Sequence, residues 1–189
     1  MSSRSRRISI RKGIDGFLGG CPPFGVEPTI EEAKYFLTVR VENRWLSLFV
    51  CGDYDALTKP LYERVLLCPR TIELIEHSGE LRRSASEWFR LGLSSHTLSL
   101  GPELPDSELH ADWAMRSKVG GEAQFDGPPP EKLPEYLRHG FTHILQIGFA
   151  GSPKEEPVDG SWPFGPWKVS FFRKQANGGG PSWLIAARR

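Results

Sequence analysis

The sequence predicts an α+β fold: a single domain built on a predominantly antiparallel β-sheet, with a few short helices. Its 189 residues include 16 Pro and 20 Gly, which implies short elements and many turns. Aromatic residues make up 11% and include six Trp, a composition typical of strands. The clearest local signal is the alternation of side chains along residues 34–51, which predicts a β-hairpin.

Composition disfavours several classes of function. The net charge of +1 gives no general attraction to nucleic acid. No apolar run approaches the ~18 residues that a membrane span needs. The three cysteines, Cys21, Cys51 and Cys68, form no Cys-x-x-Cys motif, which favours free thiols in a reducing, cytoplasmic compartment. We expect a protein with no cofactor and no membrane partner.

The chain divides into two parts by charge. Residues 1–12 contain five basic residues and no acid, and we interpret them as a basic N-terminal arm. This arm is either a solvated tail, as chain termini commonly are, with a short strand at residues 8–10, or a contact to an acidic partner or to RNA. Residues 13–189 form the predicted single globular α+β domain.

The remaining elements follow from apolar runs and turn residues. The hairpin of residues 34–51 has its predicted two-residue turn at Asn43-Arg44. Residues 70–77 fit a strand or a helix, and residues 81–93 fit a short helix or an irregular strand. The other predicted elements are strands at 62–68, at 96–100 (stopped by Gly101-Pro102) and from Trp183 to Ala187, and a helix at 131–139 ended by Gly140.

Residues 141–172 contain two aromatic-rich apolar runs joined by a polar loop. We interpret them as the core hairpin of the domain. Phe141 to Phe149 is the buried strand. The segment from Trp162 to Trp167 contains Pro163 and Pro166, which exclude it from a central ladder, so we expect it to face a partner.

The histidines do not predict a metal site. His139 and His143 are four residues apart, a spacing that would put both on one face of a helix. Gly140 lies between them, however, and in a strand this spacing separates two residues by about 13 Å. We therefore expect no metal at this pair.

The sequence contains none of the common catalytic motifs, such as Gly-x-Ser-x-Gly or His-Glu-x-x-His. Cys51 and Cys68 each end a predicted strand, where cysteine is commonly buried and inert. These observations favour a non-enzymatic protein, with an enzyme of unidentified reaction as the alternative.

Aromatic side chains are dense in the second half of the chain. They belong either to the core or to an exposed face of the kind that anchors protein interfaces. Pro163 and Pro166 make part of the segment rigid, which would lower the entropic cost of binding. The candidate partner-binding residues are Trp113, Lys118, Trp162, Phe164 and Trp167.

Three stretches resemble the YwqG-like family of bacterial proteins of unknown function. They are Lys118-Val-Gly-Gly-Glu, Ile144-Leu-Gln-Ile-Gly-Phe and Trp162-Pro-Phe-Gly-Pro-Trp-Lys-Val-Ser-Phe-Phe. The resemblance covers about residues 117–172. Ala123 stands where the family pattern has proline, and Phe164-Gly165-Pro166 replaces a Gly-Asp-x-Gly turn. The resemblance implies a mostly antiparallel β architecture and no established reaction. Such proteins are also similar to small immunity proteins that accompany bacterial toxins, an analogy at the level of the family.

Three hypotheses about function follow. The first is a cytoplasmic protein-binding protein, plausibly an immunity protein or antitoxin that neutralises a bacterial toxin by direct binding. The second is a small-molecule-binding domain or an enzyme, with ligand-pocket candidates Gly120, Gly121 and Gln146; a pocket there with a perturbed His or Cys would favour it. The third is an RNA contact through the basic arm, which the neutral net charge disfavours.

Overall fold

The computed structural model describes residues 3–10, 13–52, 57, 65–67, 71–84, 92–109, 117–125, 127–148, 162–164, 168–176 and 180–188. Strands dominate this part of the chain. In chain order they are β1 (Arg4–Ile10), β2 (Gly16–Leu18), β3 (Lys34–Val41), β4 (Arg44–Val50), β5 (Val65–Leu67), β6 (Ile72–His77), β7 (His96–Pro105), β8 (Lys118–Gly120), β9 (Thr142–Ile147), β10 (Lys168–Lys174) and β11 (Ser182–Arg188). Two short helices, α2 (Asp106–Leu109) and α3 (Leu133–Arg138), accompany them.

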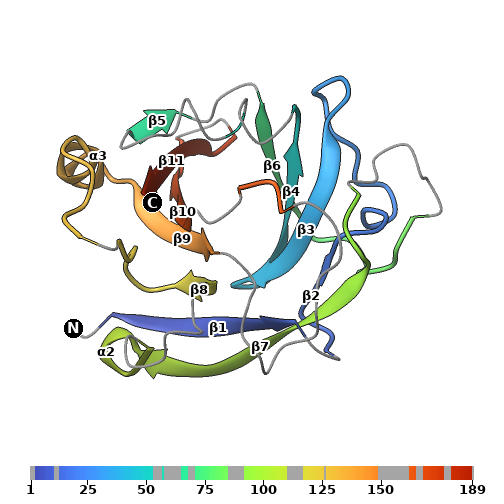
Figure 1. Ribbon diagram of the computed structural model, residues 1–189, viewed down its shortest axis with the longest axis horizontal. Coiled ribbons are helices and arrows are strands. Elements are labelled where there is room, and N and C mark those ends of the chain that lie inside the picture. Colours follow the sequence, from blue (N-terminus) through green and yellow to red (C-terminus); the bar gives the residue numbers. More distant parts are fainter. Residues whose placement is uncertain are drawn as a thin grey trace.

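The strands form one eleven-stranded sheet in the order β5-β11-β10-β9-β8-β1-β7-β2-β3-β4-β6. Neighbouring strands of this sheet pair antiparallel. Examples are β1, which pairs with β7 and with β8, and β11, which pairs with β5. The sheet curls into a nearly closed barrel, with α3 outside β9, β10 and β11 (Figure 1). The predominance of antiparallel strands is thus confirmed. The α+β class is supported only in part, because α2 has four residues and α3 has six.

The interior of the barrel is apolar because alternate side chains of each strand point inward. The interior cluster includes Leu48 of β4, Leu145 of β9 and Ile185 of β11. Three aromatic rings fill it further: Phe36 lies 5.8 Å from Phe164, and Phe164 lies 6.4 Å from Phe171, each pair edge to face.

Two smaller apolar clusters cover parts of the outer face. In one, Leu133 of α3 packs on Phe172 of β10 and Leu184 of β11. In the other, Val26 and Ala33 pack on Tyr35 of β3 and Phe49 of β4. The first cluster holds α3 against the sheet and forms the floor of the site described below.

A network of charges links strands that are distant in the sheet order. The guanidinium of Arg173 on β10 donates to Glu76 on β6 at 2.7 Å and to Glu42, which follows β3, at 3.3 Å. Arg173 and Glu76 are nearly buried, with 11% and 10% of their side chains exposed. Buried carboxylate–guanidinium pairs need such close geometry to offset desolvation. The pair links β10 to β6, which lies at the opposite end of the strand order.

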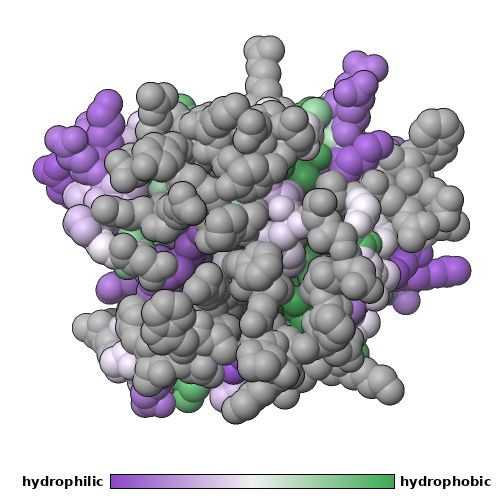
Figure 2. Space-filling model, in the orientation of Figure 1, coloured by the Kyte–Doolittle hydropathy of each residue, from purple (hydrophilic) through white to green (hydrophobic). Residues whose placement is uncertain are grey.

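Hydrophilic and apolar side chains are mixed on the surface. Hydrophilic residues of α3 gather at one edge of the face seen in Figure 2, and apolar residues show only in small separate areas. The exposed large apolar side chains in the described part are Ile14, Phe24, Leu67 and Leu137.

Several predicted elements are confirmed. Residues 34–50 form the hairpin of β3 and β4, and the two apolar runs of residues 141–172 form the adjacent strands β9 and β10. Residues 72–77 form a strand, so of the strand and the helix that the sequence allowed for residues 70–77, the strand is correct. Strand β11 includes the predicted run from Trp183 to Ala187, and Gly140 follows α3 with a φ of 89°.

Other expectations were wrong. Residues 4–10 are not a loose arm: they form β1, which pairs with β7 on one side and β8 on the other. Strand β7 continues through Gly101-Pro102 to Pro105. The turn of the first hairpin is Glu42-Asn43, because Val41 pairs with Arg44 and Glu42 takes a φ of 53°. Most of residues 81–93, and most of the predicted strand at 62–68, lie outside the described residues.

Candidate functional site

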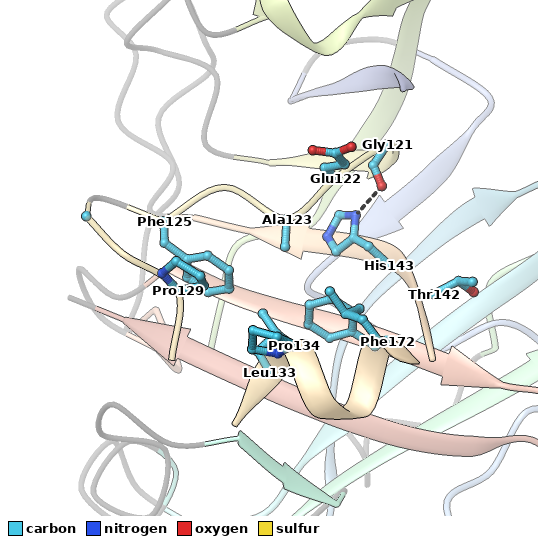
Figure 3. A pocket seen from close by; sticks show the side chains of 12 residues that line it. Gly121, Glu122, Ala123, Phe125, Pro129, Leu133, Pro134, Thr142, His143 and Phe172 are labelled. Atoms are coloured by element: carbon cyan, nitrogen blue, oxygen red, sulfur yellow. Dashed lines mark hydrogen bonds between the residues drawn. The ribbon is translucent and has the colours of Figure 1, made fainter. Parts of the chain in front are cut away.

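A pocket of about 650 Å³ opens on the outer face of the barrel. Strands β9 and β10 form its floor, α3 one wall and residues 121–129 the other (Figure 3). This volume lies within the range of small-molecule sites, roughly 300–1,000 Å³. The described lining residues are Gly121, Glu122, Ala123, Phe125, Gly127, Pro129, Leu133, Pro134, Leu137, Thr142, His143 and Phe172.

An irregularity between β9 and β10 turns His143 towards this pocket. Phe171 pairs with Leu145, whereas the next residue, Phe172, pairs with His143, so that Ile144 is the extra residue. Such a bulge reverses the inward–outward alternation beyond it. Ile144 and Leu145 consequently both belong to the barrel interior. His143 lies outside, with its ring 5.4 Å from that of Phe172.

Helix α3 supplies the apolar wall. Pro134 lies in its first turn, where proline costs no hydrogen bond. Gly140 takes the left-handed conformation that ends many helices, and its N–H donates to the carbonyl of Leu137 at 3.1 Å. The helix buries Leu133 and exposes Leu137 at the rim of the pocket.

Two consecutive glycines shape the opposite wall. Gly120 and Gly121 have φ values of 75° and 67°, in the left-handed region that favours glycine. A Cβ atom on Gly121 would lie 2.4 Å from a carboxylate oxygen of Asp106. This turn directs both glycine carbonyls at the imidazole Nδ1 of His143, at 3.1 Å and 3.3 Å.

Behind the turn, the carboxylate of Asp106 accepts hydrogen bonds from three segments of the chain. Its carboxylate accepts from the hydroxyl of Ser5, from the ammonium of Lys118 at 3.2 Å and from the N–H of Glu122 at 2.7 Å. Burial raises the pKa of Asp106, but these hydrogen bonds outweigh it and lower the pKa to about 2. Lys118 is buried, with 2% of its surface exposed, and burial lowers its pKa against the opposing effect of Asp106.

The geometry determines which ring nitrogen of His143 carries a proton. Carbonyl oxygens accept hydrogen bonds and never donate them, so Nδ1 must carry the proton. Burial of the ring and then the positive charge of Lys118 lower the pKa of His143 to about 4. The imidazole is therefore neutral near pH 7, and its Nε2 is an acceptor.

This Nε2 atom is buried and has no hydrogen-bond partner in the part of the chain that the structure describes. Figure 3 shows it on the side of the ring that faces Ala123, away from the bonded Gly121 carbonyl. Buried polar atoms are nearly always paired, so an exception calls for an explanation such as a ligand. Within the described residues, no group of three or more His, Cys, Asp or Glu side chains is arranged to hold a metal ion.

The three predicted ligand-pocket residues take different positions. Gly121 lines the pocket. Gly120 contributes its carbonyl to His143 but is not part of the lining. Gln146 is fully buried beneath the wall, where its side-chain oxygen accepts from the N–H of Gln124 at 2.8 Å. Gln146 therefore supports the segment that covers it.

The predicted partner-binding residues do not form an exposed face in the described structure. Lys118 is buried in its ion pair, and Phe164 is fully buried in the barrel interior. Trp162 is half-buried, 5.1 Å from the ring of Phe36. Trp113 and Trp167 lie outside the described residues. The expectation that Lys118 and Phe164 are exposed was wrong, because a buried counter-ion and aromatic packing hold them inside.

The spacing of His143 from His139 predicted no metal pair, and no sequence pattern placed His143 in the pocket. Nothing in the sequence singled out Asp106 either. The bulge that turns His143 outward leaves no signature in the order of apolar residues. Gly120-Gly121, in contrast, form the turn next to His143, and paired glycines indicate such a special backbone conformation.

Comparison with protein-family models, with curated proteins and with solved structures finds no match for this chain. The resemblance to the YwqG-like family and the cytoplasmic location therefore stay predictions. In the described residues, helices long and apolar enough to cross a membrane are absent.

Proposed function

We propose that this protein binds a small, largely apolar molecule in the pocket between α3, residues 121–129 and the outer face of β9 and β10. The observation that carries the proposal is the buried Nε2 of His143 at the wall of a 650 Å³ pocket, an atom with no hydrogen-bond partner among the described residues. Ligand sites typically combine an apolar lining with a few polar groups of this kind.

The lining has the composition that such a ligand requires. Ala123, Phe125 and Leu137 are at least partly exposed in the lining and offer apolar surface, whose burial against a ligand contributes about 25 cal/mol per Å². Pro129 and Pro134 restrict the backbone of both walls. A wall that is already ordered loses little conformational entropy when a ligand binds.

Binding, rather than catalysis, is the activity that the described lining supports. His143 is the one imidazole there, and no Ser or Cys nucleophile accompanies it among the described lining residues. The hydroxyl of Thr142 donates to the carbonyl of Arg173 at 3.2 Å, which directs it to the backbone of β10. A nucleophile would need a base within hydrogen-bond reach.

A binding screen with a pocket-filling variant tests this proposal. Neutral bicyclic aromatic fragments are screened by ligand-observed NMR, and their affinities are then measured by calorimetry. Figure 3 shows Ala123 between Phe125 and His143. Ala123→Phe should fill this space and weaken the binding of each hit at least about 10-fold.

The matched control is Glu135→Phe, which places the same ring on an exposed position of α3 outside the lining. This variant should bind the hits as the parent protein does. The proposal fails if no neutral fragment binds, or if Ala123→Phe and Glu135→Phe have the same affinities.

The immunity-protein hypothesis is the second candidate. What supports it in the structure is a pair of exposed apolar side chains, Ile14 at 78% and Phe24 at 73% exposure, since exposed apolar residues can anchor partners. Co-expression with the product of the neighbouring gene, followed by pull-down, should give a stable complex that Phe24→Ser weakens. The absence of any complex removes this candidate.

A further inference from the structure

We infer that the ligand is an uncharged molecule with an apolar body and one hydrogen-bond donor, which it directs at Nε2 of His143. This inference rests on the proposed function, because it assigns a ligand class to the same pocket. It goes further in naming the polar group of the ligand and the atom that receives it.

The tautomer of His143 requires a donor rather than an acceptor. Both neighbours of Nδ1 are carbonyl oxygens, those of Gly120 and Gly121, so the single proton of the neutral ring stays on Nδ1. Nε2 then presents a lone pair, which a hydroxyl or an N–H group can satisfy. A ligand that brings only a carbonyl or an ether leaves this atom unpaired.

The turn holds the ring in this state. The carboxylate of Asp106 packs so closely against Gly121 that it leaves no room for a Cβ atom there. Asp106 is in turn held by Ser5, Lys118 and the N–H of Glu122. The acceptor is therefore fixed before a ligand arrives, as preorganised binding sites require.

The charges around the pocket disfavour an anion. Glu122 contributes the carboxylate of the lining, and Lys and Arg are absent from the described lining residues. The nearby Lys118 is already neutralised by Asp106 at 3.2 Å. An anionic ligand would lose its hydration without gaining a counter-charge.

The same surroundings disfavour a cation at the His143 end. Burial is the largest effect that disfavours a proton on this ring, and burial would disfavour an ammonium group bound to Nε2 in the same way. The apolar side chains of Phe125, Leu133 and Phe172 offer such a charge no hydrogen bond. An uncharged donor fits both conditions.

Four naphthalene probes that differ in one substituent test the inference. They are 2-naphthol (uncharged donor), 2-methoxynaphthalene (uncharged, no donor), 2-naphthoate (anion) and 2-naphthylmethylammonium (cation). Calorimetry at pH 7 should show 2-naphthol binding to the parent protein about 10-fold more tightly than each of the others.

Two variants distinguish the loss of the acceptor at Nε2 from a loss of folding. In His143→Asn the side-chain amide can still donate to the carbonyl of Gly121, but nothing replaces Nε2. In His143→Gln an amide oxygen can reach the place of Nε2. The preference for 2-naphthol should disappear in the Asn variant and persist in the Gln variant. Circular dichroism and the thermal midpoint show whether each variant is folded.

The outcomes distinguish this inference from the function on which it rests. Equal affinities for 2-naphthol and 2-methoxynaphthalene, or a preference for either charged probe, overturn the ligand class and leave pocket binding intact. A preference that both variants keep, or that both lose, overturns the role of Nε2. If none of the four probes binds, the proposed function fails, and the inference fails with it.

Discussion

At the scale of single residues, the pocket depends on the backbone of Gly121. Its φ of 67° is costly for a residue with a side chain, by about 1–2 kcal/mol. A Cβ atom there would also displace the carboxylate of Asp106, which is 2.4 Å away and pairs with the buried Lys118. Breaking a buried ion pair costs about 3–5 kcal/mol.

We therefore expect Gly121→Ala to lower the free energy of unfolding by at least about 3 kcal/mol. The matched control is Gly25→Ala. Gly25 has a similar φ of 74°, but no atom lies within 4 Å of its Cβ position, so about 1 kcal/mol should be lost. Urea denaturation measures both. Equal losses would show that the contact with Asp106 is unimportant.

His143 makes stability depend on pH in a defined direction. Its pKa is about 4 in the folded protein and about 6.5 in the unfolded chain. The unfolded chain therefore binds the proton more tightly. The stabilisation from the neutral ring is complete above pH 6.5, decreases as the pH falls from 6.5 to 4 and changes little below that. Its total is at most about 3 kcal/mol.

The test compares the parent protein with His143→Asn by urea denaturation at pH 7 and pH 4.5. The parent should lose about 2 kcal/mol more than the variant over this range. His77, whose pKa burial also lowers, contributes the same slope to both proteins. Asp106 titrates below this range. The same pH dependence in both proteins would contradict a buried neutral His143.

At the scale of elements, the sequence predicted which segments form strands better than it predicted how those strands pair. The run of residues 142–147 is apolar enough to identify β9 as a buried strand. Its pairing with β10 includes a bulge at Ile144, which only the contacts of the folded sheet determine. The direction of His143, and with it the polar group of the site, was therefore not predictable from side-chain alternation.

Strand β1 illustrates a second limit. The alternation of polar and apolar residues from Arg7 to Ile10 is only four residues long, and the basic residues of this segment indicated a solvated tail. In the barrel it lies between β7 and β8, with the Arg6 side chain donating to the carbonyl of Gly101 at 2.9 Å. Pairing on both sides satisfies the backbone and outweighs the charge of the side chains.

At the scale of the whole molecule, the residues that stabilise the barrel and the residues that line the pocket lie in different places. The interior of the barrel holds the large apolar cluster. The hydrogen bond from Arg173 to Glu76 links strand β10 to strand β6. The pocket lies outside this core, covered by α3 and by residues 121–129. Substitutions at the exposed lining residues should therefore affect binding more than folding. The exceptions are Leu133 and Phe172, which hold α3 against the sheet, and Gly121, whose neighbours form the buried ion pair.

The central claim is that Nε2 of His143 is an unprotonated acceptor that receives a hydrogen bond from a ligand in this pocket. The most direct measurement is the ¹⁵N spectrum of the imidazole at pH 7, with and without 2-naphthol. Nδ1 should appear as the protonated nitrogen and Nε2 as the unprotonated one, and the Nε2 resonance should shift towards that of a hydrogen-bonded nitrogen when 2-naphthol is added. A protonated Nε2, or an Nε2 resonance that saturating 2-naphthol leaves unchanged, would contradict the claim.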